Sequence, residues 1–470
     1  MRRTKIVCTI GPATSTPESI ANLIRAGMNV ARLNFSHGEL EEHGRVIATI
    51  RQVATQLDAR IAILQDLQGP KIRIGKLDAG SVRLINDAKL TISTQPGSGN
   101  AEHLWTTYQD LPSDVRPGDR LLMSDGLVEL RVEEVAASEI HCRVTRGGVV
   151  REHSGLNLPT TRVSAPSLTE KDLGDLAFGI AHDVDYVAVS FIRQADDVVN
   201  AKRVILEAGA SIPVIAKLEK PEAIANLDAI LDVADGVMVA RGDLGVEVSV
   251  EKVPILQKTI ISRANQRGLP VITATQMLET MVHNQTPTRA EASDVANAIL
   301  DGTDAVMLSA ETAIGDYPII VVETMSRIAE EAESAPDAYR IIQQPTTPPG
   351  SFPHALAEAA ATTACRLGAA AIVAYTRSGF TAQLVSKHRP SVPIIAVTPS
   401  ERVARRTALY WGVSAQVVPV IVGVDGLLES VEAGARQSGL VKPGETVVVT
   451  TSSPDEPTHS VTNLLEIRRM

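Results

Sequence analysis

Residues 214–245, with the sequence VIAKLEKPEAIANLDAILDVADGVMVARGDLG, contain two apolar segments that each run directly into charged residues. Because side chains two apart on a strand share a face, Lys217 and Glu219 are expected to point the same way, as are Arg241 and Asp243. A buried charge without a partner is costly, so apolar strands that end in charge are atypical of a simple core. The pattern therefore predicts a metal and phosphate site at two adjoining strand ends, with a pair of structural ion pairs as the alternative.

The same kind of apolar segment recurs along the chain with helical segments between. The segments lie at 6–10, 30–35, 61–64, 186–191, 213–216, 236–240, 270–274 and 305–308. Capping boxes at Thr169 to Asp172 and at Thr288 to Glu291 predict the starts of two of the helices. Eight βα units indicate a (β/α)8 TIM barrel, a fold whose active sites lie at the carboxyl ends of the strands.

Two further segments do not follow the βα pattern. Residues 71–166 contain short β segments separated by turn dipeptides, which predicts a small β-barrel domain inserted between barrel parts 1–70 and 167–344. Residues 345–353 are rich in proline, exclude regular structure and predict a linker. The remainder of 345–470 alternates again between strands and helices, so a C-terminal α/β domain is expected.

Composition narrows the class of protein. At 470 residues, roughly two to four domains are expected. The net charge of −10 argues against nucleic acid or an anionic membrane as a partner. Cys8, Cys142 and Cys365 have no metal-ligand spacing and fit a reduced compartment. With neither a signal-peptide core nor an apolar run of membrane-spanning length, a cytoplasmic protein is expected.

Polar residues gather at the predicted strand ends. They are Arg32, Asn34, Ser36, Asp66, Ser190, Lys217, Glu219, Asp243, Thr275, Ser309 and Glu311, with Arg73 just beyond the third strand. Glu219 and Asp243 are suitable Mg²⁺ ligands, with substrate oxygens completing the shell. Lys217 could neutralise a transferring phosphoryl group or an enolate, and Arg32 and Arg73 could bind anions. Taken one at a time, each of these residues could also be a satisfied structural group.

Seven motifs in the chain resemble those of the pyruvate kinase family. They are Thr9-Ile-Gly-Pro12, Ala31-Arg-Leu-Asn-Phe-Ser-His-Gly38, Ala216-Lys-Leu-Glu219, Met238-Val-Ala-Arg-Gly-Asp-Leu-Gly245, Ala274-Thr-Gln-Met-Leu278, Pro287-Thr-Arg-Ala-Glu291 and Met307-Leu-Ser-Ala-Glu-Thr312. They occur in the family's order, and the inserted and C-terminal domains fall where that family has them. The resemblance covers essentially the full length.

The resemblance implies phosphoryl transfer from phosphoenolpyruvate to ADP, giving pyruvate and ATP in glycolysis. Glu219 and Asp243 would then hold Mg²⁺ or Mn²⁺, and Lys217 would stabilise the phosphoryl group and the enolate. Thr275 would lie near the methylene carbon that is protonated. The backbone of Gly242 and Asp243 would bind the substrate carboxylate.

The resemblance also implies the phosphate and nucleotide contacts. Arg32 and Arg73 would bind phosphates, and Arg32, Asn34 and His37 would face the nucleotide. The inserted domain would close as a lid over the site, with Asp125 as its contribution.

The monovalent-cation site of the family corresponds to Asn34, Ser36, Asp66 and Leu67. Potassium-dependent members have a Glu where this chain has Lys71, and the local set of Leu67, Gln68, Lys71 and Ile74 is similar to the potassium-independent branch. A tethered ammonium can supply the charge that K⁺ brings elsewhere. We therefore expect an enzyme that does not require K⁺; a plain surface lysine is the alternative.

The C-terminal domain contains a strand–loop–helix segment, Tyr375 to Ala382, suited to phosphate binding. By resemblance it is the effector loop, and its candidate residues are Thr376, Ser378, Gly379 and Thr381. The segment expected to cover it, 452–459, is acidic, which favours AMP or a sugar monophosphate as effector. An unregulated enzyme with a vestigial loop is the alternative. The family also implies a homotetramer, with the helix at 287–300 as a candidate interface.

Two other function classes use similar residues. A Mg²⁺-dependent lyase or aldolase acting on an enolate could share the barrel with Lys, Glu and Asp, but has no need of the inserted lid. A non-catalytic metabolite sensor would be expected to have lost Lys217, Glu219 or Asp243, and all three are present.

Overall fold

The structure is a computed structural model that describes residues 2–159, 161–335, 351–419, 424–451 and 462–470. Its centre is a closed barrel of parallel strands in the order β1-β16-β15-β14-β13-β12-β3-β2. The strands are β1 (Lys5–Thr9), β2 (Val30–Asn34), β3 (Ala62–Asp66), β12 (Tyr186–Val189), β13 (Val214–Leu218), β14 (Gly236–Ala240), β15 (Val271–Ala274) and β16 (Ala305–Leu308). Each of the eight predicted apolar segments forms one of these strands, so the expected barrel is confirmed.

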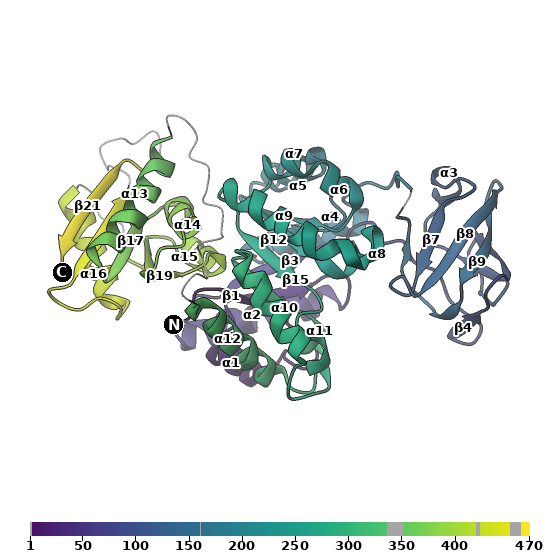
Figure 1. The fold of residues 1–470 in the computed structure, drawn as a ribbon, viewed down its shortest axis with the longest axis horizontal. Coiled ribbons are helices and arrows are strands. Elements are labelled where there is room, and N and C mark those ends of the chain that lie inside the picture. The colour runs from purple at the N-terminus through teal and green to yellow at the C-terminus, as the bar shows by residue number, and fades with distance from the viewer. Residues whose placement is uncertain (1, 160, 336–350, 420–423, 452–461) are drawn as a thin grey trace.

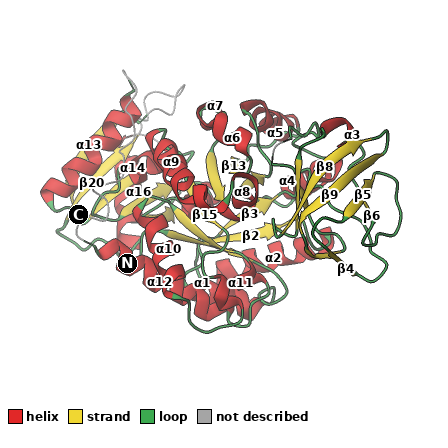
Figure 2. Cartoon of the chain, turned by 45° about the vertical axis from the view of Figure 1, so that its right-hand side comes forward, coloured by secondary structure: helices red, strands yellow, loops and turns green. Residues whose placement is uncertain are grey.

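Helices surround the barrel on its outer face (Figure 2). They are α1 (Pro17–Ala26), α2 (Leu40–Gln56), α4 (Glu170–Ala181), α5 (Ala195–Glu207), α6 (Pro221–Ala225), α7 (Leu227–Leu231), α8 (Arg241–Val248), α9 (Val253–Gln266), α10 (Arg289–Leu300), α11 (Ala310–Ala313) and α12 (Pro318–Ser334), with short 3₁₀ turns at Val250–Lys252 and Glu279–Val282. Both predicted capping boxes form: Thr169 and Asp172 cap α4, and Thr288 and Glu291 cap α10. The strands are buried on both faces because helices cover them outside and side chains fill the barrel inside.

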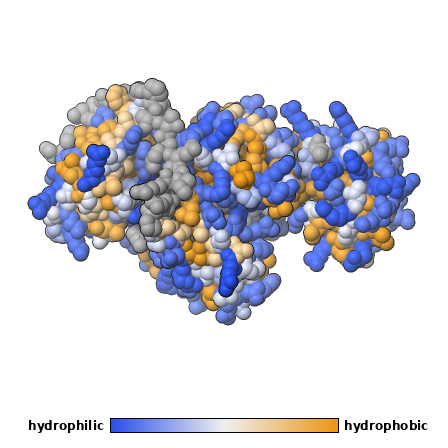
Figure 3. Space-filling model, in the orientation of Figure 1, coloured by the Kyte–Doolittle hydropathy of each residue, from blue (hydrophilic) through white to orange (hydrophobic). Residues whose placement is uncertain are grey.

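The segment between β3 and β12 forms two antiparallel-rich sheets to one side of the barrel (Figure 1). Its elements are β4 (Ser81–Leu84), β5 (Lys89–Ser93), β6 (His103–Trp105), α3 (Leu111–Asp114), β7 (Arg120–Met123), β8 (Val128–Val135), β9 (Glu139–Arg146), β10 (Gly148–Arg151) and β11 (Leu156–Asn157). The expected small β-barrel takes the form of a six-stranded sheet, β11-β7-β8-β9-β5-β6, and a two-stranded sheet, β10-β4, around one apolar core. Hydrophilic residues cover most of its visible face (Figure 3).

The C-terminal domain is a five-stranded sheet with helices on it. Its elements are α13 (Phe352–Leu367), β17 (Ala371–Tyr375), α14 (Phe380–Lys387), β18 (Ile394–Thr398), α15 (Glu401–Arg406), a 3₁₀ turn (Thr407–Leu409), β19 (Val413–Val417), α16 (Val424–Gln437), β20 (Thr446–Thr451) and β21 (Leu464–Arg469). The expectation that 345–353 excludes regular structure is wrong at its end, because α13 begins at Phe352 with Pro353 in its first turn. Proline is tolerated there since that N–H has no helical partner. The rest of the predicted linker, 345–350, lies outside the described residues.

The C-terminal domain packs on the amino-terminal ends of the barrel strands, opposite the carboxyl ends. Asp304, just before β16, contacts Lys387 and Arg389 of the C-terminal domain. The Tyr186 hydroxyl, at the start of β12, donates to the Arg406 carbonyl. This end of the barrel is closed, so the carboxyl end is left for a functional site.

Candidate active site

Lys217 lies at the centre of the polar cluster at the carboxyl ends of the strands. Its Nζ is 2.9 Å from Glu219 Oε1, 3.2 Å from Asp66 Oδ1 and 2.6 Å from Ser190 Oγ. Ser190 Oγ in turn donates to the carbonyl of Leu67 at 2.7 Å. Three neighbouring strands, β3, β12 and β13, therefore place their end residues around one ammonium group.

Arg32 joins the cluster from β2. Its Nε donates to Asp66 Oδ2 at 2.7 Å, and one terminal nitrogen donates to Thr9 Oγ1 at 2.9 Å. Burial alone would raise the pKa of Asp66, but Lys217 and Arg32 outweigh it and hold that pKa below its usual value. Asp66 is thus an anion that orients two cations, rather than a free proton acceptor.

The carboxylates of Glu219 and Asp243 lie close enough to interact electrostatically. Burial raises the pKa of Glu219, Lys217 opposes that rise, and the charge of Asp243 adds to it. Burial would lower the pKa of Lys217, but Asp66, Glu219 and Asp243 raise it above its ordinary value. Two neighbouring carboxylates that repel one another are a donor set suited to a hard divalent cation. The residues present therefore fit Mg²⁺ or Mn²⁺.

Among the described residues, no group of three or more His, Cys, Asp or Glu side chains could hold a metal by itself. A cation held by Glu219 and Asp243 would need further oxygen ligands. Mg²⁺ commonly binds in this way, through one or two carboxylates with substrate oxygens and water.

Thr275 meets the start of α8 at the end of β15. Its hydroxyl accepts a hydrogen bond from the Gly242 N–H at 2.7 Å and donates to the Ala274 carbonyl at 2.6 Å. Thr275 has a φ of 68°, a left-handed conformation that non-glycine residues adopt at some cost. The Gly242 N–H was expected to bind the substrate carboxylate; in this conformation it is already bonded to Thr275.

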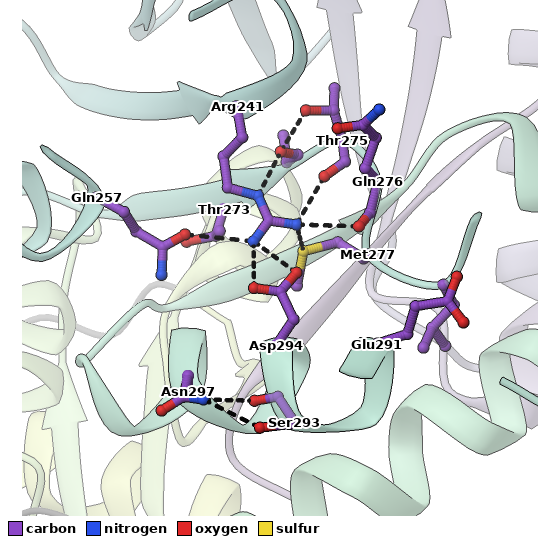
Figure 4. Close-up of polar contacts among 12 residues, drawn as sticks. Arg241, Gln257, Thr273, Thr275, Gln276, Met277, Glu291, Ser293, Asp294 and Asn297 are labelled. Carbon is purple, nitrogen blue, oxygen red and sulfur yellow. Dashed lines mark hydrogen bonds and ion pairs between the residues drawn. The ribbon is translucent and has the colours of Figure 1, made fainter. Parts of the chain in front are cut away.

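Arg241 does not share a face with Asp243, contrary to the expectation from strand periodicity. β14 ends at Ala240, and Arg241 is the first residue of α8. Its guanidinium points toward Asp294 and donates to that carboxylate at 2.7 Å (Figure 4). It also donates to the carbonyls of Thr275 and Gln276. Arg241 therefore fixes the loop that carries Thr275.

A cleft of about 900 Å³ separates α8 from the inserted domain. Asp243 and Gly242 line it on the barrel side, and Lys71, Asp125 and Gly126 line it on the other. Asp125 is exposed, with a φ of 54°. The expected contribution of the inserted domain thus faces the cleft.

Lys71, Arg73 and Arg32 form one positively charged neighbourhood. Burial lowers the pKa of His37, and the charges of Arg73, Lys71 and Arg32 lower it further. An Arg73 terminal nitrogen donates to the His153 carbonyl at 3.0 Å. This neighbourhood can attract phosphate groups.

The remaining predicted residues are placed as follows. Asn34 accepts the Ser36 N–H at 3.2 Å, so these two lie together at the end of β2. Glu311 accepts the N–H groups of Ser309 and Leu278, which is a structural role. Ser309 and Glu311 are therefore not brought into the Lys217 cluster by these contacts.

The candidate effector loop precedes α14. The Gly379 N–H donates to Thr376 Oγ1 at 2.9 Å, and Gly379 has a φ of 93°. The Phe380 N–H is 3.4 Å from Ser378 Oγ, and Thr381 Oγ1 is 2.7 Å from Thr462 Oγ1. The acidic segment 452–459 lies outside the described residues.

Three residues next to the cluster were not predicted from the sequence. Thr9 holds Arg32, and a buried pair of Lys220 and Glu247 lies beside Glu219. Thr9 ends β1, and Lys220 directly follows Glu219, so the position at a strand end was the available signal. In the part of the chain that is described, no helix is long and apolar enough to cross a bilayer.

Comparison with known proteins identifies the family of this chain. Residues 1–322 match the family model described as the pyruvate kinase barrel domain, and residues 354–468 match that of the pyruvate kinase alpha/beta domain. A pyruvate kinase from Geobacillus stearothermophilus is 49% identical over 99% of this chain and 80% of the relative. One from Staphylococcus aureus strain MRSA252 is 47% identical with the same coverage.

A crystal structure of a pyruvate kinase from Cryptosporidium parvum superposes with a TM-score of 0.93 at 38% identity. The match covers 100% of this chain and 96% of that one. Both family models, the two relatives and the matching structure identify the same family. The chain therefore belongs to the pyruvate kinase family and is a phosphotransferase.

Proposed function

We propose that this enzyme transfers the phosphoryl group of phosphoenolpyruvate to ADP, forming pyruvate and ATP. The observation that carries the proposal is the contact of one buried ammonium, Lys217, with Asp66, Glu219 and Ser190 at the open end of the barrel. Phosphoryl transfer depends mainly on positioning and electrostatic stabilisation, which a fixed array of charges supplies.

Lys217 stabilises the phosphoryl group in transfer and the enolate that remains. Its raised pKa keeps it protonated throughout the neutral range. Arg32 is held rigid by Asp66 and Thr9, so it presents a fixed guanidinium to phosphate. Arg73, in the same positively charged neighbourhood, exchanges its contact with the His153 carbonyl for a phosphate oxygen.

Glu219 and Asp243 hold the divalent cation, Mg²⁺ or Mn²⁺. When bound, that cation supplies positive charge to the phosphate and enolate oxygens. Thr275 lies beside α8, where it orients the proton donor to the methylene carbon. The Gly242 N–H leaves Thr275 Oγ1 to bind the substrate carboxylate, so substrate binding frees an acceptor site on the threonine oxygen.

We infer that the nucleotide lies against Arg32, Asn34 and His37, and that K⁺ is not required. Lys71 lines the cleft and contributes to the positive charge that lowers the pKa of His37. The ammonium of Lys71 can supply the positive charge that a bound K⁺ would supply at the site formed by Asn34, Ser36, Asp66 and Leu67.

We also propose a wider assignment, which family membership supports. The enzyme serves glycolysis in the cytoplasm as a homotetramer. A phosphorylated effector, AMP or a sugar phosphate, binds Thr376, Ser378, Gly379 and Thr381. The inserted domain, proposed as 71–166, closes over the barrel parts 1–70 and 167–344, and 345–470 is the regulatory domain.

The test measures pyruvate formation from phosphoenolpyruvate and ADP with Mg²⁺ in tetramethylammonium buffer, before and after addition of K⁺. Full activity without K⁺ would support both the reaction and the role of Lys71. Activity only with K⁺ would keep the reaction and refute the role of Lys71. A folded protein inactive in both would refute the proposed reaction and favour a sensor or a lyase.

A further inference from the structure

A buried ion pair connects the two segments that carry the candidate metal ligands. Lys220 Nζ lies 2.7 Å from Glu247 Oε1, and their side chains are only 11% and 1% exposed. Lys220 directly follows Glu219. Glu247 is four residues after Asp243 on α8, so the two occupy the same face one turn apart. The ion pair thus joins the backbone beside one carboxylate to the helix that carries the other.

The inserted domain contacts the same glutamate. Asn157, the last residue of β11, donates from Nδ2 to Glu247 Oε1 at 2.9 Å. Glu247 Oε1 therefore accepts from the barrel and from the inserted domain at once. The second oxygen, Oε2, is buried and has no hydrogen-bond partner among the described residues. Gly126 of the inserted domain also approaches α8, since a Cβ there would lie 3.6 Å from Val246.

Charge explains why Lys220 is needed in this place. Glu219 and Asp243 already place two carboxylates beside this pair, one next to Lys220 in the sequence and one a helical turn before Glu247. Glu247 adds a third carboxylate nearby, and Lys220 neutralises it. A buried ion pair is weak support for stability alone, because apolar replacements are often as stable. Its position between the two candidate metal ligands and the inserted domain points to a positioning use instead.

We propose that Lys220 and Glu247 are positioning residues that hold Glu219 and Asp243 at the spacing for a divalent cation. Through Asn157, the same pair is the docking point of the inserted domain. Metal affinity and docking of the inserted domain are therefore coupled. The inference rests on the proposed function, since it takes Glu219 and Asp243 as the metal ligands.

The first experiment measures binding of Mn²⁺ alone to the full chain by the electron paramagnetic resonance of free Mn²⁺. Lys220→Met should weaken binding by about 10- to 100-fold, the usual effect of losing a group that orients a metal ligand. Glu247→Gln, which keeps the size of the side chain, should also weaken it and serves if Lys220→Met does not fold.

The matched control is Lys202→Met. Lys202 Nζ, on α5, lies 2.7 Å from Asp235 Oδ1, and Asp235 accepts the Val214 N–H, so this half-exposed pair lies at the other ends of β13 and β14. The Lys202→Met variant should bind Mn²⁺ as tightly as the wild type. Equal Mn²⁺ affinities of Lys220→Met and Lys202→Met would overturn the inference, whether both variants bind like the wild type or both bind more weakly.

The second experiment tests coupling to the inserted domain by hydrogen exchange. Coupling is reciprocal, so Mn²⁺ should slow exchange of the Leu156 amide, which bonds to the Ile72 carbonyl. This protection should disappear in Asn157→Ala and persist in Gln109→Ala, which removes a hydrogen bond to the Thr94 carbonyl within the inserted domain. Protection that survives in Asn157→Ala would refute docking through Glu247.

A third variant, Glu219→Gln, is included in the Mn²⁺ binding measurement. It separates failure of the inference from failure of the proposed function. If Glu219→Gln abolishes Mn²⁺ binding while Lys220→Met does not alter it, the inference alone is wrong. If Glu219→Gln has no effect and the wild-type chain forms no pyruvate, the proposed metal site and reaction are wrong, and the inference falls with them.

Discussion

Replacing Asp304 with Asn removes the charge at the centre of the contact between barrel and C-terminal domain. Asp304 Oδ2 lies 2.5 Å from Lys387 Nζ and accepts the Val271 N–H at 2.7 Å, and Oδ1 lies 2.9 Å from an Arg389 nitrogen. The side chains of Asp304, Lys387 and Arg389 are each about 1% exposed. Asparagine keeps the shape of the side chain but leaves two buried cations without their anion.

Removing one partner of a buried pair typically costs about 3–5 kcal/mol, because the remaining charge stays desolvated. For a domain the size of the C-terminal one, a loss of that size lowers the melting temperature by on the order of 10 °C. We therefore expect calorimetry of Asp304→Asn to show an earlier transition assigned to separation and melting of the C-terminal domain. The chain has several domains, so transitions are compared rather than fitted to two states.

The control is Asp228→Asn, which breaks contacts to Arg263 and Arg267 at a half-exposed site on the barrel surface. Exposed ion pairs contribute little, so this variant should melt close to the wild type. If Asp304→Asn and Asp228→Asn melt at the same temperature, the reasoning from burial is refuted.

The pH dependence gives a second check on Asp304. Burial would raise its pKa, but Arg389 and Lys387 outweigh burial and lower the pKa below the ordinary value. A carboxylate with a lowered folded pKa stabilises the protein above its unfolded pKa, near 3.9, and that stability is lost as the pH falls through the folded pKa. The difference between wild type and Asp304→Asn should therefore be full at pH 6 and shrink at strongly acidic pH.

Three further outcomes are expected. Lys217→Met should lower kcat by roughly 10²- to 10³-fold, as loss of one transition-state contact does, measured by pyruvate formation with the circular dichroism spectrum unchanged; a near-normal kcat would contradict its role. Lys71→Glu should create a K⁺ requirement, seen as activity that rises on K⁺ addition to tetramethylammonium buffer, and equal activity with and without K⁺ would count against it. Arg241→Lys should lower kcat more than it lowers stability, because a lysine cannot hold both Asp294 and the Thr275 carbonyl; an unchanged kcat would exclude that positioning role.

The alternation of side chains along a strand was enough to predict part of the site. Lys217 and Glu219 share a face as expected, and their charged atoms lie 2.9 Å apart. Parallel strands meet at one edge of the barrel, so residues at the ends of different strands could be expected together. Asp66 and Ser190 join Lys217 for that reason. Local capping chemistry likewise predicted the starts of α4 and α10.

Arg241 shows where this reasoning fails. The strand period of two was extended three residues too far, to Asp243, because β14 ends at Ala240 and the helical period begins at Arg241. A change of period by one residue turns a side chain to another direction. Asp294, which accepts a hydrogen bond from Arg241, lies on α10, far along the sequence. No local pattern indicates that pairing. Boundaries between elements therefore limit site prediction more than the elements themselves do.

The pair of Lys220 and Glu247 extends the same argument. Each residue has a local signal: Lys220 follows a metal candidate, and Glu247 is one helical turn from another. Neither signal indicates that the two meet, nor that Asn157 of an inserted domain joins them. Those contacts depend on how β13, α8 and β11 are placed relative to one another. Candidate catalytic residues can thus be proposed from periodicity, whereas the residues that contact them from other segments are found only once the fold brings those segments together.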